Sequence, residues 1–337
     1  MKFSKKASIL ADRLSNSINR IPGLTGILLK LIRGYALNND LTSKEIKILS
    51  FMIRMIIRGQ GKAIIRTPSG LFFNAFDQSQ YVNQVLLLKG TNMDYCWEPN
   101  GSRLLIDLIK PDDRIVVAGA NIGFETIIIG NNLKSGNGIC YAFEPIKENY
   151  KILKENIRLN KLELKIKTFP FALSNIDCES RMLSAGPNSS LLYLNEGDKL
   201  QKVLVRRLDT LWNEGKIDLI SGLIADVEGN EWEIISGAEE LLSISPIRFM
   251  FFEINKKTEE VTSGKIKNML FYLLDKKYYL FAVPDDYRGF QKLSSIKKKL
   301  ICIMDPENPF VLPNRWFNVL AVKEQVLVEL PSWIMCK

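Results

Sequence analysis

The sequence predicts an α/β protein built around a mostly parallel, doubly wound sheet, and three observations lead to this class. Short apolar runs alternate with longer amphipathic segments, which is typical of repeated strand-helix units. A glycine turn within residues 116–126 joins one apolar run to a helical segment. Carboxylates directly follow later apolar runs, at the strand ends where open α/β sheets bind ligands. We therefore expect a ligand site at the carboxyl edge of the sheet.

The glycine turn begins the predicted sheet. Residues 113–118 are typical of a buried strand, and residues 124–133 are typical of a helix. Gly119 can adopt backbone angles denied to other residues, and Gly123 lets the helix start pack closely on the sheet. The N–H groups of such a helix start can bind an anionic or carboxylate-bearing ligand. The turn suggests a cofactor site, although small residues occur at many strand-helix turns.

A second predicted strand, residues 138–143, ends in Glu144 and Pro145. At this position a carboxylate can accept hydrogen bonds from both hydroxyls of a nucleoside ribose. The alternative is a solvated charge at the strand end. Residues 147–159 then predict a helix that is closed by Asn160.

The third strand is predicted at residues 164–169 and is followed by a loop at residues 171–175. Backbone groups of such a loop can hydrogen-bond the edge of an adenine, while Phe171 or Leu173 packs against its face. Phe171 is equally compatible with the protein core. A polar turn at residues 186–190 predicts a β-hairpin insertion after this loop.

Two carboxylates follow the fourth predicted strand, residues 219–225. Asp226 and Glu228 are one residue apart, so in an extended segment both side chains point the same way, at the strand ends where ligands bind. Alternatively, they stabilise the start of a helix predicted at residues 232–242 through its dipole. Glu253 ends a further buried run and would reach the same rim if its strand runs parallel.

Positive charge is concentrated at the N-terminus. Residues 1–66 hold 13 Lys or Arg against three acidic residues, a balance of +10, whereas the remaining 271 residues carry −1. Residues 44–58 predict a helix with a broad apolar face and a basic stripe. Such a helix can rest on anionic lipid, or it can pack against the main domain or a second subunit. We predict a basic helical extension over residues 1–60 and one domain over residues 61–337, with its core at about 100–323.

The composition excludes several classes of site. The chain has no histidine, which excludes histidine triads, imidazole bases and the common histidine metal sites. Its five cysteines are scattered without metal-ligand or disulfide spacing. No apolar run approaches the roughly 18 residues of a membrane span, and no cleaved signal peptide is recognisable. We expect a cytoplasmic protein, with peripheral contact at the inner membrane face through the basic segment as an open alternative.

Six blocks of the chain resemble the FkbM-type family of S-adenosylmethionine (SAM)-dependent methyltransferases: in order, GANIGFET, AFEPIKENYKILKENIRLN, FALSN, RRLDTL, ADVEGNEWEIISGAEELL and FFEI. The resemblance covers residues 67–323 and is far more specific than a single glycine motif. It implies a class I methyltransferase fold, which is a seven-stranded, mostly parallel sheet with helices on both faces and an antiparallel last strand, here residues 316–322. It also implies SAM as the cofactor and a hydroxyl oxygen as the methyl acceptor. Asp226 and Glu228 could hold a single metal ion such as Mg²⁺, although methyl transfer does not require one.

The resemblance further implies roles for individual residues. Glu144 would hold the ribose of SAM, and Asp226 and Glu228 would face the reaction centre. The methionine end would lie against Gly119, Ala120, Asn121 and Gly123, and the adenine near Ala172, Leu173 and Ser174. Without histidine, the base that activates an alcohol must be a carboxylate, lysine, tyrosine or water. We predict Asp226 or Glu228 as this base, with Glu253 as the third candidate.

Two positions depart from the family pattern. The family usually has an acidic residue two places before the first glycine, where this chain has Val117, and a lysine before the Asp-Val-Glu-Gly block, where it has Ile224. A SAM-fold binding or scaffold protein with weakened activity is therefore one alternative. A nicotinamide-dependent oxidoreductase is a second, although no Tyr-x-x-x-Lys pair is suitably placed.

The family's usual substrates imply a small-molecule or glycan acceptor, such as a sugar hydroxyl of a glycan, glycolipid or secondary metabolite. A nucleic-acid partner is disfavoured because residues 308–310, Asn-Pro-Phe, lack the second proline of the usual motif, and the chain after residue 66 is nearly neutral. A homo-oligomer is compatible with the sequence.

Overall fold

The computed structural model describes residues 24–57, 64–75, 81–183, 200–245, 247–255, 259–260, 264–283, 301–302, 307 and 316–330. Contacts divide the chain into two compact units. The first comprises Met1–Pro99 and Asp286–Lys297, and the second comprises Asn100–Asp285 and Lys298–Lys337. Our predicted boundary at residues 60 and 61 lies outside the described residues. The compact unit that contains the N-terminal helices runs to Pro99, and the predicted boundary stays a prediction.

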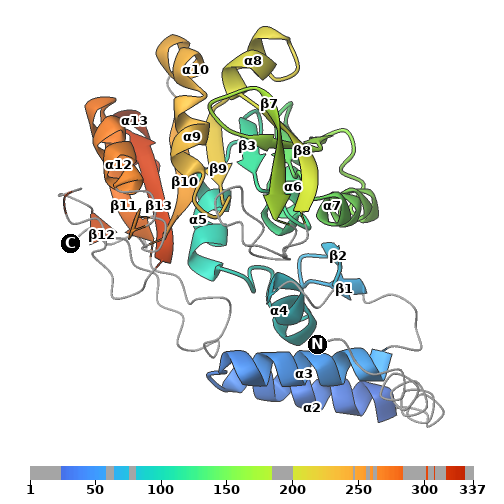
Figure 1. Ribbon diagram of the computed structural model, residues 1–337. Helices are drawn as coiled ribbons and strands as arrows, with labels where there is room; N and C mark the ends of the chain where they lie inside the picture. The colour runs from blue at the N-terminus through green and yellow to red at the C-terminus, as the bar shows by residue number, and fades with distance from the viewer. Residues whose placement is uncertain are drawn as a thin grey trace. The chain divides into compact units, whose positions relative to one another are not determined.

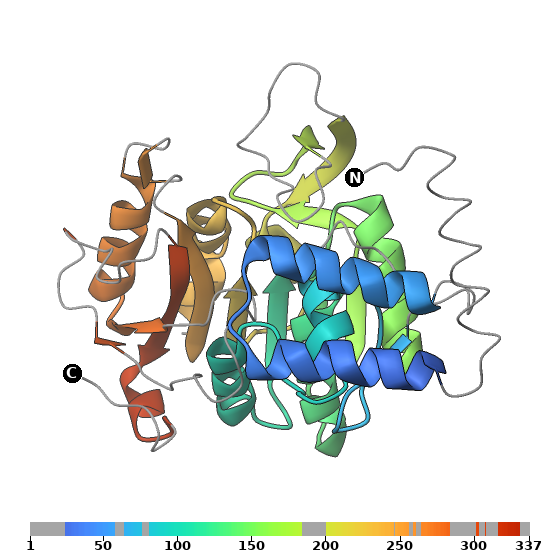
Figure 2. The ribbon, with the colours of Figure 1, turned by 90° about the horizontal axis from the view of Figure 1, so that it is seen from below.

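The first unit is helical with a small hairpin. It contains α2 (Leu24–Asn38), α3 (Ser43–Ile57), α4 (Tyr81–Lys89), β1 (Ile64–Arg66) and β2 (Phe72–Asn74), with β1 and β2 antiparallel. Figure 2 shows α2 and α3 side by side. A reciprocal cap starts α3: the Thr42 N–H donates to the Glu45 carboxylate at 2.8 Å, and the Glu45 N–H donates to Thr42 Oγ1 at 3.2 Å. None of the helices within the described residues is long and apolar enough to cross a membrane.

The second unit contains the predicted doubly wound sheet (Figure 1). Its strands run in the order β12-β11-β13-β10-β9-β3-β4-β5. They are β3 (Arg114–Ala118), β4 (Ile139–Phe143), β5 (Ile166–Phe169), β9 (Gly222–Ala225), β10 (Phe249–Asn255), β11 (Tyr278–Val283), β12 (Ile301–Cys302) and β13 (Trp316–Lys323). The predicted class is confirmed: β13 is antiparallel to β10 and β11, and the two-residue β12 adds an edge strand to the seven expected.

The strand order places a topological switch point between β3 and β9. From β3 the chain adds β4 and β5 on one side, and it returns to add β9 and β10 on the other. Because such crossovers are right-handed, the connections on the two sides lie on opposite faces of the sheet. Within the described residues, the helices of this unit include α5 (Pro99–Leu108), α6 (Phe124–Asn132), η2 (Leu133–Ser135), α7 (Lys147–Leu159), α8 (Leu208–Asn213), α9 (Glu231–Ser236), α10 (Glu239–Ile244), α12 (Lys265–Asp275) and α13 (Glu324–Leu327). In open α/β folds, ligands bind at this switch point.

The segment predicted as a loop at residues 171–175 is in part a strand, so that prediction was wrong. Residues Phe171–Leu173 form β6, which pairs in parallel with β8 (Leu200–Arg206) in a separate three-stranded sheet. The third strand, β7 (Cys178–Leu183), pairs antiparallel with β8 and supplies the predicted hairpin. The predicted turn at residues 186–190 lies outside the described residues.

The prediction of a single helix at residues 232–242 was also wrong, because this segment forms two helices, α9 and α10. The break lies at Gly237, where a Cβ atom would lie 2.2 Å from the carbonyl oxygen of Ser174. Asp209 of α8 then caps the second helix, since its carboxylate accepts the N–H groups of Glu240 and Leu241 at 3.2 and 3.1 Å. Both contacts come from segments that are distant in sequence.

Candidate active site

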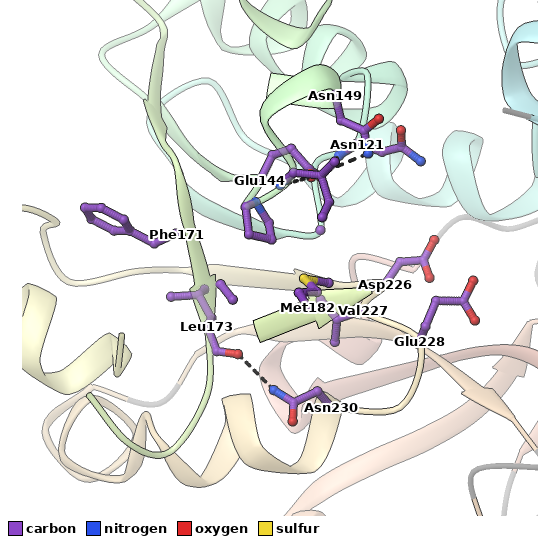
Figure 3. Close-up of a pocket in the computed structure, with 14 residues that line it drawn as sticks. Asn121, Glu144, Asn149, Phe171, Leu173, Met182, Asp226, Val227, Glu228 and Asn230 are labelled. Atoms are coloured by element: carbon purple, nitrogen blue, oxygen red, sulfur yellow. Dashed lines mark hydrogen bonds between the residues drawn. The ribbon is translucent and has the colours of Figure 1, made fainter. Parts of the chain in front are cut away.

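A pocket lies at the carboxyl ends of β3, β4 and β9 (Figure 3). Seven of the predicted site residues line it: Gly119, Asn121, Glu144, Ala172, Leu173, Asp226 and Glu228. The pocket holds about 640 Å³ of space between atoms, counting its open mouth. The structure therefore brings together groups that were proposed for cofactor binding and for catalysis.

Four predicted site residues are not among the lining residues. Ala120 is buried and donates its N–H to the Phe143 carbonyl, and Ser174 is buried and donates its N–H to the Arg206 carbonyl. Gly123 starts α6, and a Cβ atom there would lie 2.6 Å from a side-chain carbon of Leu153, so this glycine allows α6 to pack on α7. Glu253 lies on β10, opposite Asn318 of β13. Their proposed roles in binding or catalysis remain predictions.

Gly119 brings two loops of the site into contact. Its φ angle is +78°, which favours glycine, and its N–H donates to the Phe143 carbonyl at 3.0 Å. A Cβ atom at this position would lie 2.1 Å from the backbone carbonyl oxygen of Asp226. The glycine is therefore required by the close approach of the Asp226 backbone, in addition to any approach by a ligand.

Glu144 is a buried carboxylate that faces the pocket, with 4% of its surface exposed. One oxygen accepts the Asn121 N–H at 2.8 Å, and the other accepts the Ile146 N–H at 2.8 Å and the Asn149 amide at 3.5 Å. Burial raises the pKa of Glu144 to about 7, and these three donors oppose the rise. Each carboxylate oxygen has two lone pairs, so the oxygen that accepts the Asn121 N–H can take one further hydrogen bond from a ligand. A second becomes available on the other oxygen if the 3.5 Å contact with Asn149 is replaced.

Asp226 and Glu228 lie in a bend after β9, since that strand ends at Ala225. Glu228 has a φ angle of +56°, so the alternation expected of an extended segment does not apply. Figure 3 nevertheless shows the two carboxylates side by side and pointing the same way. The predicted geometry therefore holds for a different reason, which is the left-handed bend at Glu228.

Glu231 holds this bend, and we did not single it out from the sequence. One of its carboxylate oxygens accepts the N–H groups of Val227 and Gly229, both at 3.2 Å. Burial raises the pKa of Glu231 to about 8, and the charge of Asp226 also raises it. The Asn230 amide donates to the Leu173 carbonyl at 2.9 Å, which ties the bend to β6. A glutamate three residues after Glu228, at a helix start, is the local signal that could have identified this clamp.

Six other lining residues were not predicted from the sequence. These are Pro145, Ile146, Asn149, Met182, Val227 and Asn230. Met182 comes from β7 and belongs to a buried cluster with Ile146, Ala172, Val203 and Val205. Ile146 and Asn149 follow Glu144 within one helical turn, so their position was accessible from the sequence. Met182 had no comparable signal, because its place depends on the pairing of β7 with β8.

The two departures from the family pattern, Val117 and Ile224, are neighbours in the sheet. They are register partners on β3 and β9, and they are 3% and 4% exposed. Partners in register point to the same face of a sheet. Two apolar side chains thus occupy the positions where the family pattern places an acidic residue and a lysine. Because both charged residues are replaced, neither position leaves an unpaired charge in the core.

This pairing predicts that Val117→Asp alone lowers the free energy of unfolding by about 3–5 kcal/mol, because it leaves an uncompensated charge in the core. Val117→Asp combined with Ile224→Lys should recover a large part of that loss. Urea unfolding of the wild type, both single variants and the double variant provides the test. Purely additive losses would contradict a direct interaction between these positions.

Within the described part of the chain, no three cysteine, aspartate or glutamate side chains are placed to hold a metal ion. The sheet order, the antiparallel β13 and the pocket at the switch point together define a class I methyltransferase fold. Residues 118–280 match the family model described as "Methyltransferase FkbM domain". This part of the chain is an FkbM-type domain of SAM-dependent methyltransferases.

Solved structures that resemble the chain include the methyltransferase FkbM from Methylobacillus flagellatus KT, with 15% identity and a TM-score of 0.42; the match covers 73% of this chain and 55% of that one. An O-methyltransferase from Bacillus cereus in complex with SAH has 14% identity and a TM-score of 0.39, covering 66% and 80%. A putative O-methyltransferase from Klebsiella pneumoniae has 11% identity and a TM-score of 0.40, covering 66% and 79%. No curated protein matches the sequence significantly.

Proposed function

We propose that the pocket binds SAM and that the enzyme transfers its methyl group to a hydroxyl oxygen of a sugar. One observation carries the proposal: a buried carboxylate suited to a ribose, Glu144, shares a single pocket with the paired carboxylates Asp226 and Glu228. Glu144 follows β4 and Asp226 follows β9, on either side of Gly119 at the end of β3. A cofactor held by Glu144 would have its reactive end near a group able to accept a proton.

The residues present suit the parts of SAM. Glu144 would accept hydrogen bonds from the ribose hydroxyls, and the turn at Gly119 and Asn121 would receive the methionine portion. Ala172 and Leu173, which also line the pocket, would lie against the adenine. The apolar side chain of Met182 extends that surface and rests on the buried cluster beneath it.

The chemistry assigned to the protein is positioning and proton removal. SAM supplies a reactive sulfonium methyl when it is bound, so the enzyme must mainly hold the acceptor oxygen in line with that methyl. A carboxylate of the pocket would take the hydroxyl proton as the acceptor oxygen gains the methyl group, with S-adenosylhomocysteine as the other product. The chain has no histidine, and Asp226 and Glu228 are the carboxylates nearest to this task.

A sugar acceptor suits the pair of carboxylates. Two side chains that lie next to each other and point the same way can accept hydrogen bonds from two neighbouring hydroxyls. The acceptor test is incubation with radiolabelled SAM and separate panels of sugars, small phenols, peptides and RNA. A methyl ether that survives mild alkali, formed on the sugar panel, supports the proposal. Label that appears only as an alkali-labile ester or on nitrogen would contradict it.

Glu144→Gln should weaken SAM binding by roughly 10- to 100-fold, because hydrogen bonds to a charged acceptor contribute about 1.5–3 kcal/mol. Ribose hydroxyls donate to the ionised carboxylate, whose pKa is about 7 in the free protein. SAM affinity should therefore rise as the pH increases from 6 to 8, with release of a proton on binding. Calorimetric titration across this range measures both effects.

Glu163→Gln provides the control, since Glu163 is an exposed glutamate outside the pocket. It should keep wild-type affinity and the wild-type pH profile. Glu144→Gln should lose the pH dependence while keeping the wild-type circular dichroism spectrum. A folded Glu144→Gln variant with unchanged SAM affinity at pH 8 would remove Glu144 from the cofactor site.

A further inference from the structure

The helix pair of the first unit has an exposed apolar face. Ile27, Leu31 and Tyr35 recur every fourth residue on α2, and Ile48 and Met52 do so on α3. Their exposed fractions are 59%, 65%, 48%, 48% and 44%, respectively. We call these five side chains the docking face. Tyr35 and Ile48 line one surface hollow together with Glu45 and Leu49, which shows that the stripes of the two helices are continuous.

The docking face is separate from the surface that holds the helices together. The buried residues of α2 are Ile32 and Ala36, and those of α3 include Ile46, Ile53 and Ile56. The Arg33 side chain donates to the Leu87 carbonyl of α4 at 3.1 Å. Each helix thus has a packed stripe and a second apolar stripe that is exposed. Apolar side chains scattered singly on a surface are normal, whereas a contiguous patch indicates a binding surface.

Cations lie within the same exposed stripes. Lys30 is exposed between Ile27 and Leu31 on α2, and Lys44 and Lys47 are exposed on the turn of α3 that precedes Ile48. The carboxylate of Glu45, the acidic residue of α3, accepts hydrogen bonds from the Thr42 N–H and hydroxyl at 2.8 and 2.7 Å. Residues 1–66 together carry a balance of +10. A surface that mixes aliphatic, aromatic and lysine side chains combines the two attractions that hold proteins on anionic membranes.

We propose that the docking face binds the headgroup region of an anionic lipid bilayer. The aliphatic side chains and Tyr35 would enter the boundary between headgroups and acyl chains, while the lysines would contact lipid phosphates. Charge complementarity favours this occupant over a second copy of the chain. In a two-fold dimer through this face, Lys30, Lys44 and Lys47 of both copies would meet. The Glu45 carboxylate that lines the hollow is already engaged by the N–H and hydroxyl of Thr42. The proposal concerns only the first unit and is independent of the methyl acceptor.

Sedimentation of the full chain with lipid vesicles tests the proposal. We expect binding to vesicles that contain phosphatidylglycerol, weak binding to pure phosphatidylcholine, and release at high salt. Changing Lys30, Lys44 and Lys47 together to Gln should weaken binding about 100-fold, since each cation near an anionic surface contributes about 1 kcal/mol. Leu31→Ser should weaken binding tenfold or more, because burying a leucine side chain contributes about 1.5–3 kcal/mol.

Matched controls keep the test specific. Changing Lys147, Lys151 and Lys154 to Gln removes the same charge from the exposed surface of α7, and Leu164→Ser alters a leucine that is 89% exposed in the second unit. Both controls should bind like the wild type. If both triple lysine variants lose vesicle binding equally, the effect depends on net charge alone, and the proposal for the docking face is overturned. Absence of vesicle binding, combined with self-association that Leu31→Ser abolishes, would assign the face to a second copy and also overturn the proposal.

Discussion

Replacing Asp226 by asparagine should lower kcat by about 10²- to 10⁴-fold, the usual contribution of a general base. Asp226 lines the pocket and lies on the bend that touches Gly119, so its carboxylate is close to where the reactive end of the cofactor would lie. Asparagine keeps the shape of the side chain but cannot accept the hydroxyl proton. SAM affinity should change little, because the ribose contact is assigned to Glu144. Single-turnover methyl transfer and calorimetric titration separate the two effects.

The other two carboxylates discriminate between the candidates for the base. Glu228→Gln should reduce turnover less than Asp226→Asn, since we propose that Glu228 only accepts a hydrogen bond from a neighbouring substrate hydroxyl. Glu253→Gln should change turnover only a few-fold, because Glu253 is not among the residues that line the pocket. If Asp226→Asn retains turnover while Glu228→Gln loses it, the base is Glu228. If both retain turnover, the proton passes to water or to another group.

Gly119→Ala should lower the free energy of unfolding by about 3 kcal/mol or more and abolish SAM binding. Two costs combine at this position. The left-handed backbone, with φ at +78°, costs roughly 1–2 kcal/mol for a residue with a side chain. The added Cβ atom would also lie 2.1 Å from the Asp226 carbonyl oxygen, so the bend that carries Asp226 must move. Thermal unfolding and SAM titration measure the two consequences.

Gly215→Ala provides a control that separates strain from steric contact. Gly215 also has a left-handed backbone, with φ at +68°, but no atom lies within 4 Å of the Cβ position. Its replacement should cost only about 1–2 kcal/mol and leave SAM binding intact. If the two alanine variants lose equal stability and both bind SAM, the close approach of Gly119 to the Asp226 backbone is not required for stability or for SAM binding.

Contacts from several segments fix the backbone of the bend at Asp226. These contacts explain why the residues after Glu228 are glycine, asparagine and glutamate. Gly119 allows the main chain to approach from β3, and Glu231 accepts the N–H groups of Val227 and Gly229. Gly229 adopts a φ angle of +107°, and the Asn230 amide links the bend to β6. These residues thus shape the site, although none of them is a candidate base.

The sequence by itself determined the order of the strands of the main sheet, and seven of the residues that it predicted for the site, some of them through the family resemblance, line the pocket. Local signals carry this information: α7 spans Lys147–Leu159 as its periodicity predicts, and Glu144 follows β4 directly. The carboxyl ends of parallel strands meet at one edge, so residues that follow different strands are brought together by topology alone.

The tertiary structure decided what depends on contacts between distant segments. Pairing with β8 makes a strand of residues predicted as a loop, and it brings Met182 of β7 to the pocket. The approach of Gly237 to the Ser174 carbonyl divides one predicted helix into two. Val117 and Ile224 stand 107 positions apart in the chain and become partners only through the register of β3 and β9. Local hydrophobic periodicity does not predict such contacts, because each depends on the position of a strand or helix that is distant in the sequence.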